Sequence, residues 1–232
     1  MDNSRVDLAH TLRRVTPACR QLLLDANVSR VLIATIDPTS RGDGGAAVLK
    51  AAGVDVEVGV LADEAQVVLG PWLAATRRRR PWVVWLSSAL AGTCDPADLD
   101  TVRELRQEAD VVISSDGRIL EGIPGGHGTG RFHHPPRIDF ADPIASLNQI
   151  FEGGTRTALV VGDTPFTRAL LALGAIDQAL IDVPRSNSEI NGASHVQGNL
   201  THGFRIEMVT TTADAVRIVA RPDAPGDGIL RG

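Results

Sequence analysis

The chain has little cysteine, almost no lysine and no long apolar run. Its two cysteines, Cys19 and Cys94, are too few for a disulfide framework and suit a reducing cytoplasm. No segment approaches the roughly 18 uninterrupted apolar residues of a membrane span. The N-terminus, MDNSRVDLAH, lacks the apolar centre of a signal peptide. We therefore expect a cytoplasmic protein without a membrane partner.

Positive charge comes almost entirely from arginine, because Lys50 is the only lysine among 23 basic residues. The formal net charge of -5 argues against the global basic field that favours nucleic acid, so no nucleic-acid partner is expected. One local basic run, at residues 77–80, is typical of a solvated surface, and anion binding is the alternative.

What the 232 residues do contain is an alternation of strand-like and helix-like segments. Strands are predicted at 31–36, 54–60, 82–86, 110–114, 157–161, 176–183, 203–210 and 214–220, and helices at 17–26, 44–53, 62–76, 96–109, 142–152 and 166–173. The first strand is continuous and β-branched, as in a strand buried on both faces. The alternation predicts an α/β protein with a mainly parallel sheet and helices on both of its faces.

Two polar segments interrupt this pattern, one at 121–137 and one at 186–203. Five of the six histidines lie there, but without the local HxxxH or CxxC spacing of a metal site, so no metal is expected. Glu189 and His195 are the acid/base pair that catalysis could use. Asn191 and His195 could hydrogen-bond a polar ring. A serine-hydrolase site is excluded, because the chain has no G-x-S-x-G motif.

Five segments occur in an order that identifies a family. They are TPACRQLLLDANVSRVLIATIDP (16–38), AAGVDVEVGVLADEA (51–65), WLAATRRRRPWV (72–83), TVRELRQEADVVISSDGRIL (101–120) and ALVVGDTPFTRALLALGAIDQAL (158–180). In this order, with the closing hairpin, they resemble the bifunctional deaminase/reductase of riboflavin biosynthesis, a RibD-like family. The resemblance implies a dihydrofolate-reductase-like domain at 77–232, behind a truncated cytidine-deaminase-like α/β lobe at 1–76.

The resemblance implies a deaminase lobe without zinc chemistry. Cys19, in TPAC, matches the last zinc ligand of the family, whereas the preceding ligand would fall within 6–10, which holds no cysteine. A lone cysteine cannot hold zinc tetrahedrally. We therefore expect Cys19 to be a structural relic, and residues 1–76 to be scaffold or a surface for homodimer formation.

The expected substrate contacts start on the first reductase strand, where the family has a lysine and this chain has Trp85. Trp85 could stack on a flat heterocycle, or it could fill the core instead. Because Trp82 lies three residues earlier on the same strand, the two rings face opposite sides of the sheet. Ser87, Glu121, Asn191 and His195 are the other expected substrate contacts.

The cofactor positions that the resemblance implies are Ser115, Gly117, Gly162, Asp163, Thr164 and Thr167. Thr164 and Thr167 begin a helix, so their hydroxyls and N–H groups could face an anion. Asp163 would repel a diphosphate, and its alternative role is to cap that helix.

Taken with the family, these residues imply NAD(P)H-dependent reduction of a ribosylaminopyrimidine phosphate or a related nucleotide-like heterocycle, with NADPH as the expected cofactor. Many of the family's polar positions have changed, which leaves two alternatives open. One is a catalytically inactive pseudoenzyme that binds a small molecule or a partner protein. The other is a scaffold repurposed for specialised metabolism.

Overall fold

A computed structural model of the chain describes residues 19–39, 44–88, 100–123, 133–184, 203–211 and 215–223. The chain divides into two compact units, Met1–Gly70 and Pro71–Gly232. The division falls inside helix α4 (Ala62–Arg78). Pro71 has no N–H group, so it cannot donate the helical hydrogen bond to the carbonyl of Val67. The boundary expected between residues 76 and 77 lies in the same helix, and the assignment of 1–76 to a deaminase lobe stays a prediction.

The first unit contains a two-stranded parallel sheet. Its elements are α2 (Cys19–Asp25), β1 (Arg30–Ile33), α3 (Gly44–Ala51) and β2 (Asp55–Val58). β1 and β2 pair in parallel, and among the described residues they form a sheet of their own. The prediction of a strand at 31–36 buried on both faces is wrong, because the strand ends at Ile33 and Leu32 is 56% exposed. A sheet of this size is too small to cover both faces of a strand.

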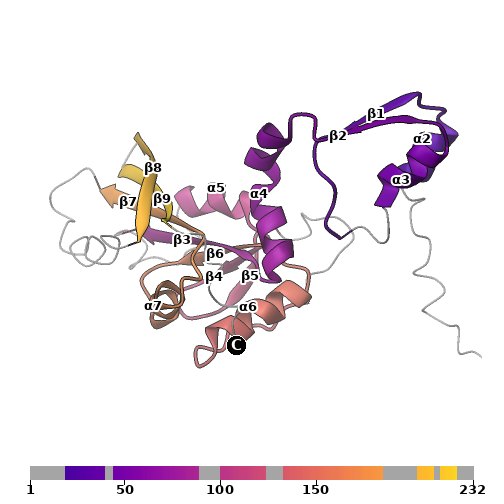
Figure 1. Ribbon diagram of the computed structural model, residues 1–232. Helices are drawn as coiled ribbons and strands as arrows, with labels where there is room; N and C mark the ends of the chain where they lie inside the picture. Colours follow the sequence, from indigo (N-terminus) through magenta and orange to yellow (C-terminus); the bar gives the residue numbers. More distant parts are fainter. Residues whose placement is uncertain are drawn as a thin grey trace, which may run out of the picture. The chain divides into compact units, whose positions relative to one another are not determined.

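The second unit is built on a seven-stranded sheet, counted over the described residues (Figure 1). Its strands are β3 (Trp82–Ser88), β4 (Val111–Ile113), β5 (Ile119–Glu121), β6 (Thr157–Val161), β7 (Gln178–Pro184), β8 (Phe204–Thr211) and β9 (Ala215–Pro222). The spatial order is β5-β4-β6-β3-β7-β9-β8. β4, β6, β3 and β7 are parallel to one another, which confirms the mainly parallel sheet, whereas β5, β9 and β8 join antiparallel. Strand β5 is missing from the sequence prediction, because three residues show too little alternation.

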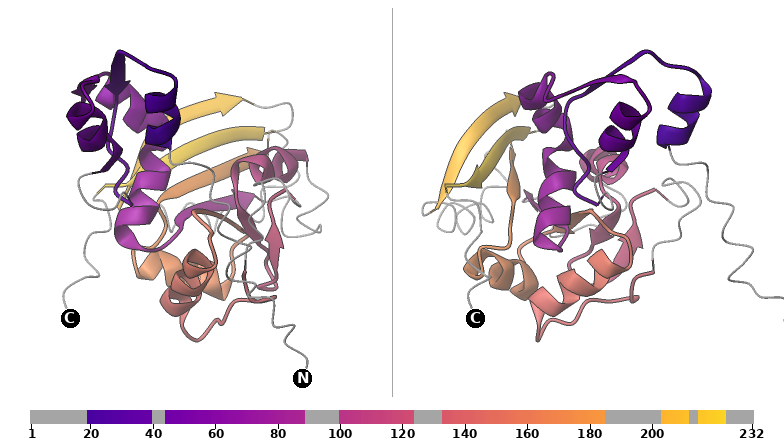
Figure 2. Two further views of the ribbon diagram at one scale, coloured as in Figure 1. Left: turned by 90° about the vertical axis from the view of Figure 1, so that its right-hand side faces the viewer. Right: turned by 45° about the vertical axis from the view of Figure 1, so that its right-hand side comes forward.

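Helices cover both faces of this sheet, as predicted. They are α5 (Asp100–Glu108), α6 (Pro143–Glu152) and α7 (Pro165–Ala172). Val83 and Trp85 of β3 join the core that α6 and α7 cover, where Phe166 of α7 is also buried, and Figure 2 shows these two helices on the same side of the sheet. Leu86 points to the opposite face and packs with Val102 of α5. The alternation of side chains along a strand produces this division.

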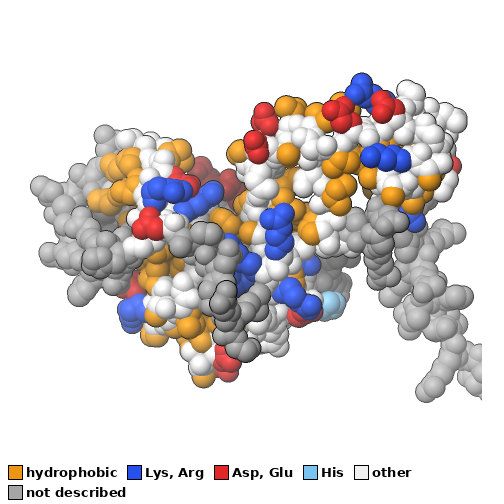
Figure 3. All heavy atoms as spheres, in the orientation of Figure 1, with side chains coloured by type: hydrophobic (Ala, Val, Ile, Leu, Met, Phe, Trp, Pro, Cys, Tyr) orange, Lys and Arg blue, Asp and Glu red, His pale blue; other side chains and the backbone are white. Residues whose placement is uncertain are grey.

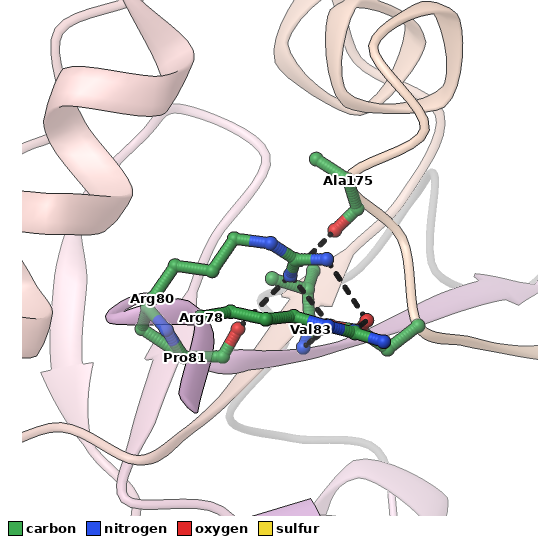
Figure 4. A network of polar contacts seen from close by, with 6 residues as sticks. Arg78, Arg80, Pro81, Val83 and Ala175 are labelled. Atoms are coloured by element: carbon green, nitrogen blue, oxygen red, sulfur yellow. Dashed lines mark hydrogen bonds and ion pairs between the residues drawn. The ribbon is translucent and has the colours of Figure 1, made fainter. Parts of the chain in front are cut away.

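A buried ion cluster that includes Arg80 holds the start of β3 (Figure 4). Arg80 and Asp177 form its centre. Arg80 donates from its two terminal nitrogens to Oδ2 and Oδ1 of Asp177, at 2.7 and 2.9 Å. Arg78 also donates to this carboxylate, and so does the N–H of Val83, at 2.8 Å. The interpretation of 77–80 as a solvated surface is therefore wrong for Arg80, which is 7% exposed. It holds for Arg79, whose exposed side chain pairs with Glu152.

Candidate functional site

The parallel strands β4 and β6 end side by side, and the turns that follow them carry the expected cofactor residues. β4 pairs with β6 as far as Ile113 and Val160. Beyond them, a Cβ added to Gly162 would lie 3.8 Å from the Cβ of Ser115. The fold thus brings together two segments that are far apart in the sequence. Ligands of open α/β sheets bind at such carboxyl ends.

Gly162 joins the ends of three elements. Its N–H donates to the carbonyl of Leu86, at the end of β3. Its own carbonyl accepts from the indole Nε1 of Trp85 and from the hydroxyl of Thr167, both at 2.9 Å. Its φ of 88° lies in the left-handed region that favours glycine, as does the φ of 81° at Gly117.

Helix α7 is capped by Thr164, so the prediction that Asp163 caps it is wrong. Thr164 Oγ1 accepts from the Thr167 N–H at 3.1 Å, and Thr167 Oγ1 accepts from the Thr164 N–H at 2.8 Å. The buried hydroxyls therefore accept hydrogen bonds from backbone N–H groups at the start of the helix. Their contact with an anion stays a prediction. Asp163 pairs instead with Arg168 at 3.1 Å, which compensates the charge that would repel a diphosphate.

Trp85 is 1% exposed and packs among core side chains. Of the two roles open to it, core filling is the one that this burial favours, and a substrate contact stays a prediction. Ser87 is also buried, whereas Glu121 is half-buried at the end of β5. The next residue is a glycine for a steric reason, because a Cβ on Gly122 would lie 1.8 Å from the carbonyl oxygen of Ala109.

Asp116 organises the turn between β4 and β5. Its carboxylate accepts from the Ser114 hydroxyl, from the Arg118 Nε at 2.8 Å and from an Arg137 terminal nitrogen at 3.4 Å. The hydrogen bond from Ser114 lowers the pKa of Asp116 most; partial desolvation opposes it, and Arg118 lowers the pKa further. The sequence marked Ser115 and Gly117 as cofactor positions but gave no sign of this cluster, because Arg137 reaches it from another segment.

A second ion pair lies at the end of β7. Arg217 donates from Nε and a terminal nitrogen to the two carboxylate oxygens of Asp182, at 2.8 and 3.0 Å. Asp182 is buried and stands opposite Ser88 of β3. The hydrogen bond to Asp182 raises the pKa of Arg217, desolvation opposes this, and the charges of Asp182, Glu104 and Glu108 add to the increase. No local sequence pattern predicted the pair.

Three expected site residues, Glu189, Asn191 and His195, lie outside the described residues. Within the described ranges, no three His, Cys, Asp or Glu side chains gather as a metal site would require. In the same ranges, no helix combines the length and apolarity needed to cross a bilayer. Basic and acidic side chains form small separate groups on the face drawn in Figure 3.

Comparison with known sequences finds similar proteins, although no family model matches the chain. The riboflavin biosynthesis protein RibD of Chlamydia pneumoniae is 33% identical over 122 residues, 47% of this chain and 32% of that protein. RibD of Mycobacterium tuberculosis is 35% identical over 125 residues, 47% of this chain and 36% of that protein. RibD of Corynebacterium ammoniagenes is 28% identical over 213 residues, 75% of this chain and 61% of that protein. The chain thus spans less than two thirds of the length of each of these relatives.

Solved structures share the fold. A diaminohydroxyphosphoribosylaminopyrimidine deaminase/5-amino-6-(5-phosphoribosylamino)uracil reductase of Thermotoga maritima superposes with a TM-score of 0.60 at 15% identity. That match covers 88% of this chain and 74% of the other. RibD of Acinetobacter baumannii gives a TM-score of 0.59 at 16% identity, over 89% and 76% of the two chains.

Proposed function

Because the chain belongs to the RibD-like family of riboflavin biosynthesis, we propose that it is a reductase of the riboflavin-pathway type. Its substrate is a ribosylaminopyrimidine phosphate or a related heterocycle, and its cofactor is NAD(P)H. The observation that carries this proposal is the meeting of the β4 and β6 turns at Gly162 and Ser115.

The residues at this meeting point fit a dinucleotide. The missing side chain of Gly162 leaves its backbone open to close approach by a diphosphate, and Ser115 offers an exposed hydroxyl. Asp163 does not oppose such an anion with a full charge, because Arg168 pairs with it. NAD(P)H supplies the hydride when it is bound.

Residues of this chain position the cofactor, bind the substrate and supply the proton. The turns at 115–117 and 162–167 hold and orient the cofactor beside the carboxyl end of β3. Asn191 binds the heterocycle. Glu121 lies opposite Val111 at the amino end of β4, away from the 115–117 turn, so we assign it no contact with the cofactor. Glu189 and His195 hold the proton that the reduced substrate takes up.

A second candidate function is supported by Trp85. By the resemblance, Trp85 takes the position at which the family has a substrate-binding lysine. Its side chain is buried in the core and donates a hydrogen bond to the Gly162 carbonyl. The second candidate is therefore a protein that binds a nucleotide-like ligand without reducing it, either as a pseudoenzyme or as a repurposed scaffold. In either case we expect a cytoplasmic homodimer.

Thermal unfolding and titration calorimetry with NADPH and with NADH, followed by oxidation of either cofactor in the presence of the aminopyrimidine substrate, separate these functions. Binding with turnover supports the reductase, and binding without turnover supports the second candidate. Absence of binding by both NADPH and NADH rejects the reductase. A Ser115→Phe variant should block the space beside Gly162 and abolish binding. Ser29→Phe, at another exposed serine, is its matched control.

A further inference from the structure

Two arginines stand directly opposite each other beside the proposed nucleotide site. Arg118 and Arg137 form an isolated antiparallel bridge. The hydrogen bonds around it run from the Ile119 N–H to the Pro136 carbonyl, at 2.9 Å, and from the Ile138 N–H to the Gly117 carbonyl, at 3.0 Å. Because these bonds flank the pair, it is of the non-hydrogen-bonded kind, in which side chains lie closest and share one face.

This arrangement costs stability, because like charges directly opposite each other repel. Both side chains are substantially exposed, at 48% for Arg118 and 61% for Arg137. Within the described part of the chain, both guanidinium groups form their ion pairs with the same carboxylate, Asp116. One carboxylate facing two guanidinium groups leaves a net positive charge on this surface.

The guanidinium groups also retain the means to bind an anion. Each carries five N–H donors, and the contacts with Asp116 use Nε of Arg118 and the two terminal nitrogens of Arg137. Those contacts orient the two planar groups from one side. A phosphate monoester offers two negative charges and three acceptor oxygens, which suit paired arginines.

We propose that Arg118 and Arg137 bind the phosphate monoester of a ligand at the end of β4, beside the turn at 115–117. The proposal rests on the proposed function for the class of ligand. Two phosphates have this chemistry: the 2′-phosphate of NADPH and the sugar phosphate of the aminopyrimidine substrate. The bound phosphate offsets the repulsion within the arginine pair.

Titration calorimetry on the full chain tests this with two ligand pairs that differ by one phosphate, NADPH against NADH and ribose 5-phosphate against ribose. We expect the phosphorylated member of at least one pair to bind about tenfold more tightly, which corresponds to one good charge-assisted contact. Arg118→Gln and Arg137→Gln should each remove most of that preference. Arg79→Gln, at another exposed arginine in an ion pair, should leave it unchanged.

An Asp116→Asn variant distinguishes a phosphate-binding role of the two arginines from a purely structural one. It removes the carboxylate that competes with phosphate, so phosphate affinity should rise while the melting temperature of the free protein falls. If the arginines were merely structural, the Asp116→Asn substitution would lower the phosphate affinity and the melting temperature together.

Each outcome decides the proposal. A preference for NADPH places the cofactor phosphate on the arginines, and a preference for ribose 5-phosphate alone places the substrate phosphate there. Equal binding of NADPH and NADH, with no preference for ribose 5-phosphate, overturns the proposal but leaves the reductase function standing. Failure of all four ligands to bind overturns both. A preference that survives both glutamine substitutions also overturns the arginine assignment.

Discussion

Arg80 and Asp177 form a two-point ion pair with both side chains buried, although 97 residues separate them in the sequence. The neighbouring pair, Arg79 with Glu152, is exposed. The two pairs give a matched comparison of buried and exposed charge. Asp177→Asn should destabilise the second unit by about 3–5 kcal/mol, because it leaves the buried Arg80 without a counter-charge. Glu152→Gln should change stability by less than about 0.5 kcal/mol.

Urea unfolding followed by circular dichroism measures both effects. Similar losses of unfolding free energy in the two variants would mean that removing a buried partner costs no more than removing an exposed one.

Gly122→Ala should be among the costliest small substitutions in the second unit. The new Cβ would meet the carbonyl of Ala109, which belongs to backbone and cannot rotate away. We expect a loss of about 3 kcal/mol in the free energy of unfolding. Gly174→Ala is the control, because Gly174 has a φ of 62° but no atom near its Cβ position. Its expected cost is about 1 kcal/mol, from backbone strain alone. Equal midpoints of urea unfolding would contradict the steric explanation.

Trp85→Phe should destabilise the protein more than Trp82→Phe. The first substitution removes a buried hydrogen bond to Gly162 and leaves a gap in the core, at about 1–3 kcal/mol. The second replaces a half-buried indole, whose ring centre lies 5.5 Å from the Arg221 guanidinium, with a smaller phenyl ring, and should cost about 0.5–1 kcal/mol. Thermal unfolding of the two variants measures the difference. The reverse order would show that Trp85 is not a core residue.

The stability that Asp116 provides should depend on pH in one direction. The pKa of Asp116 is lowered in the folded protein, chiefly by Ser114 and then by Arg118. Its contribution is therefore present above the ordinary aspartate pKa of about 3.9 and is lost as the pH falls through the lower folded value. Wild type should be more stable than Asp116→Asn at neutral pH, and the gap should close in acid. Urea midpoints of both proteins, measured from neutral pH to about pH 3, check this. A stability difference that grows as the pH falls would contradict the expected pH dependence.

The fold was largely predictable because most elements carry a local pattern. Strand 157–161 has the same bounds in sequence and structure, and helix 166–173 differs from α7 by one residue at each end. The cap of α7 was assigned one residue too early, since Asp163 and Thr164 both suit an N-cap and only backbone geometry separates them.

The candidate site was less predictable, because its ion pairs join distant segments. The arginine run at 77–80 looks like surface when taken alone, and only the position of Asp177 in the folded chain makes Arg80 a buried residue. Arg118 and Arg137 likewise meet only because the segment before α6 returns to the β4 turn. The meeting of Ser115 with Gly162 was within reach of sequence analysis, since the ends of parallel strands lie at one edge of a sheet.

The position of β3 affects how the protein is made. This strand lies between β6 and β7, both of which follow it by many residues. The N–H of Val83, its second residue, has no partner until Asp177 has been made. On the ribosome, β3 therefore leaves the exit tunnel with both edges unpaired and with Arg80 lacking its counter-charge. It acquires both neighbours only after β7 has emerged. Ribosome-bound chains that stop short of Asp177 should be sensitive to protease at β3 and bind chaperones, while chains that extend beyond β9 should resist.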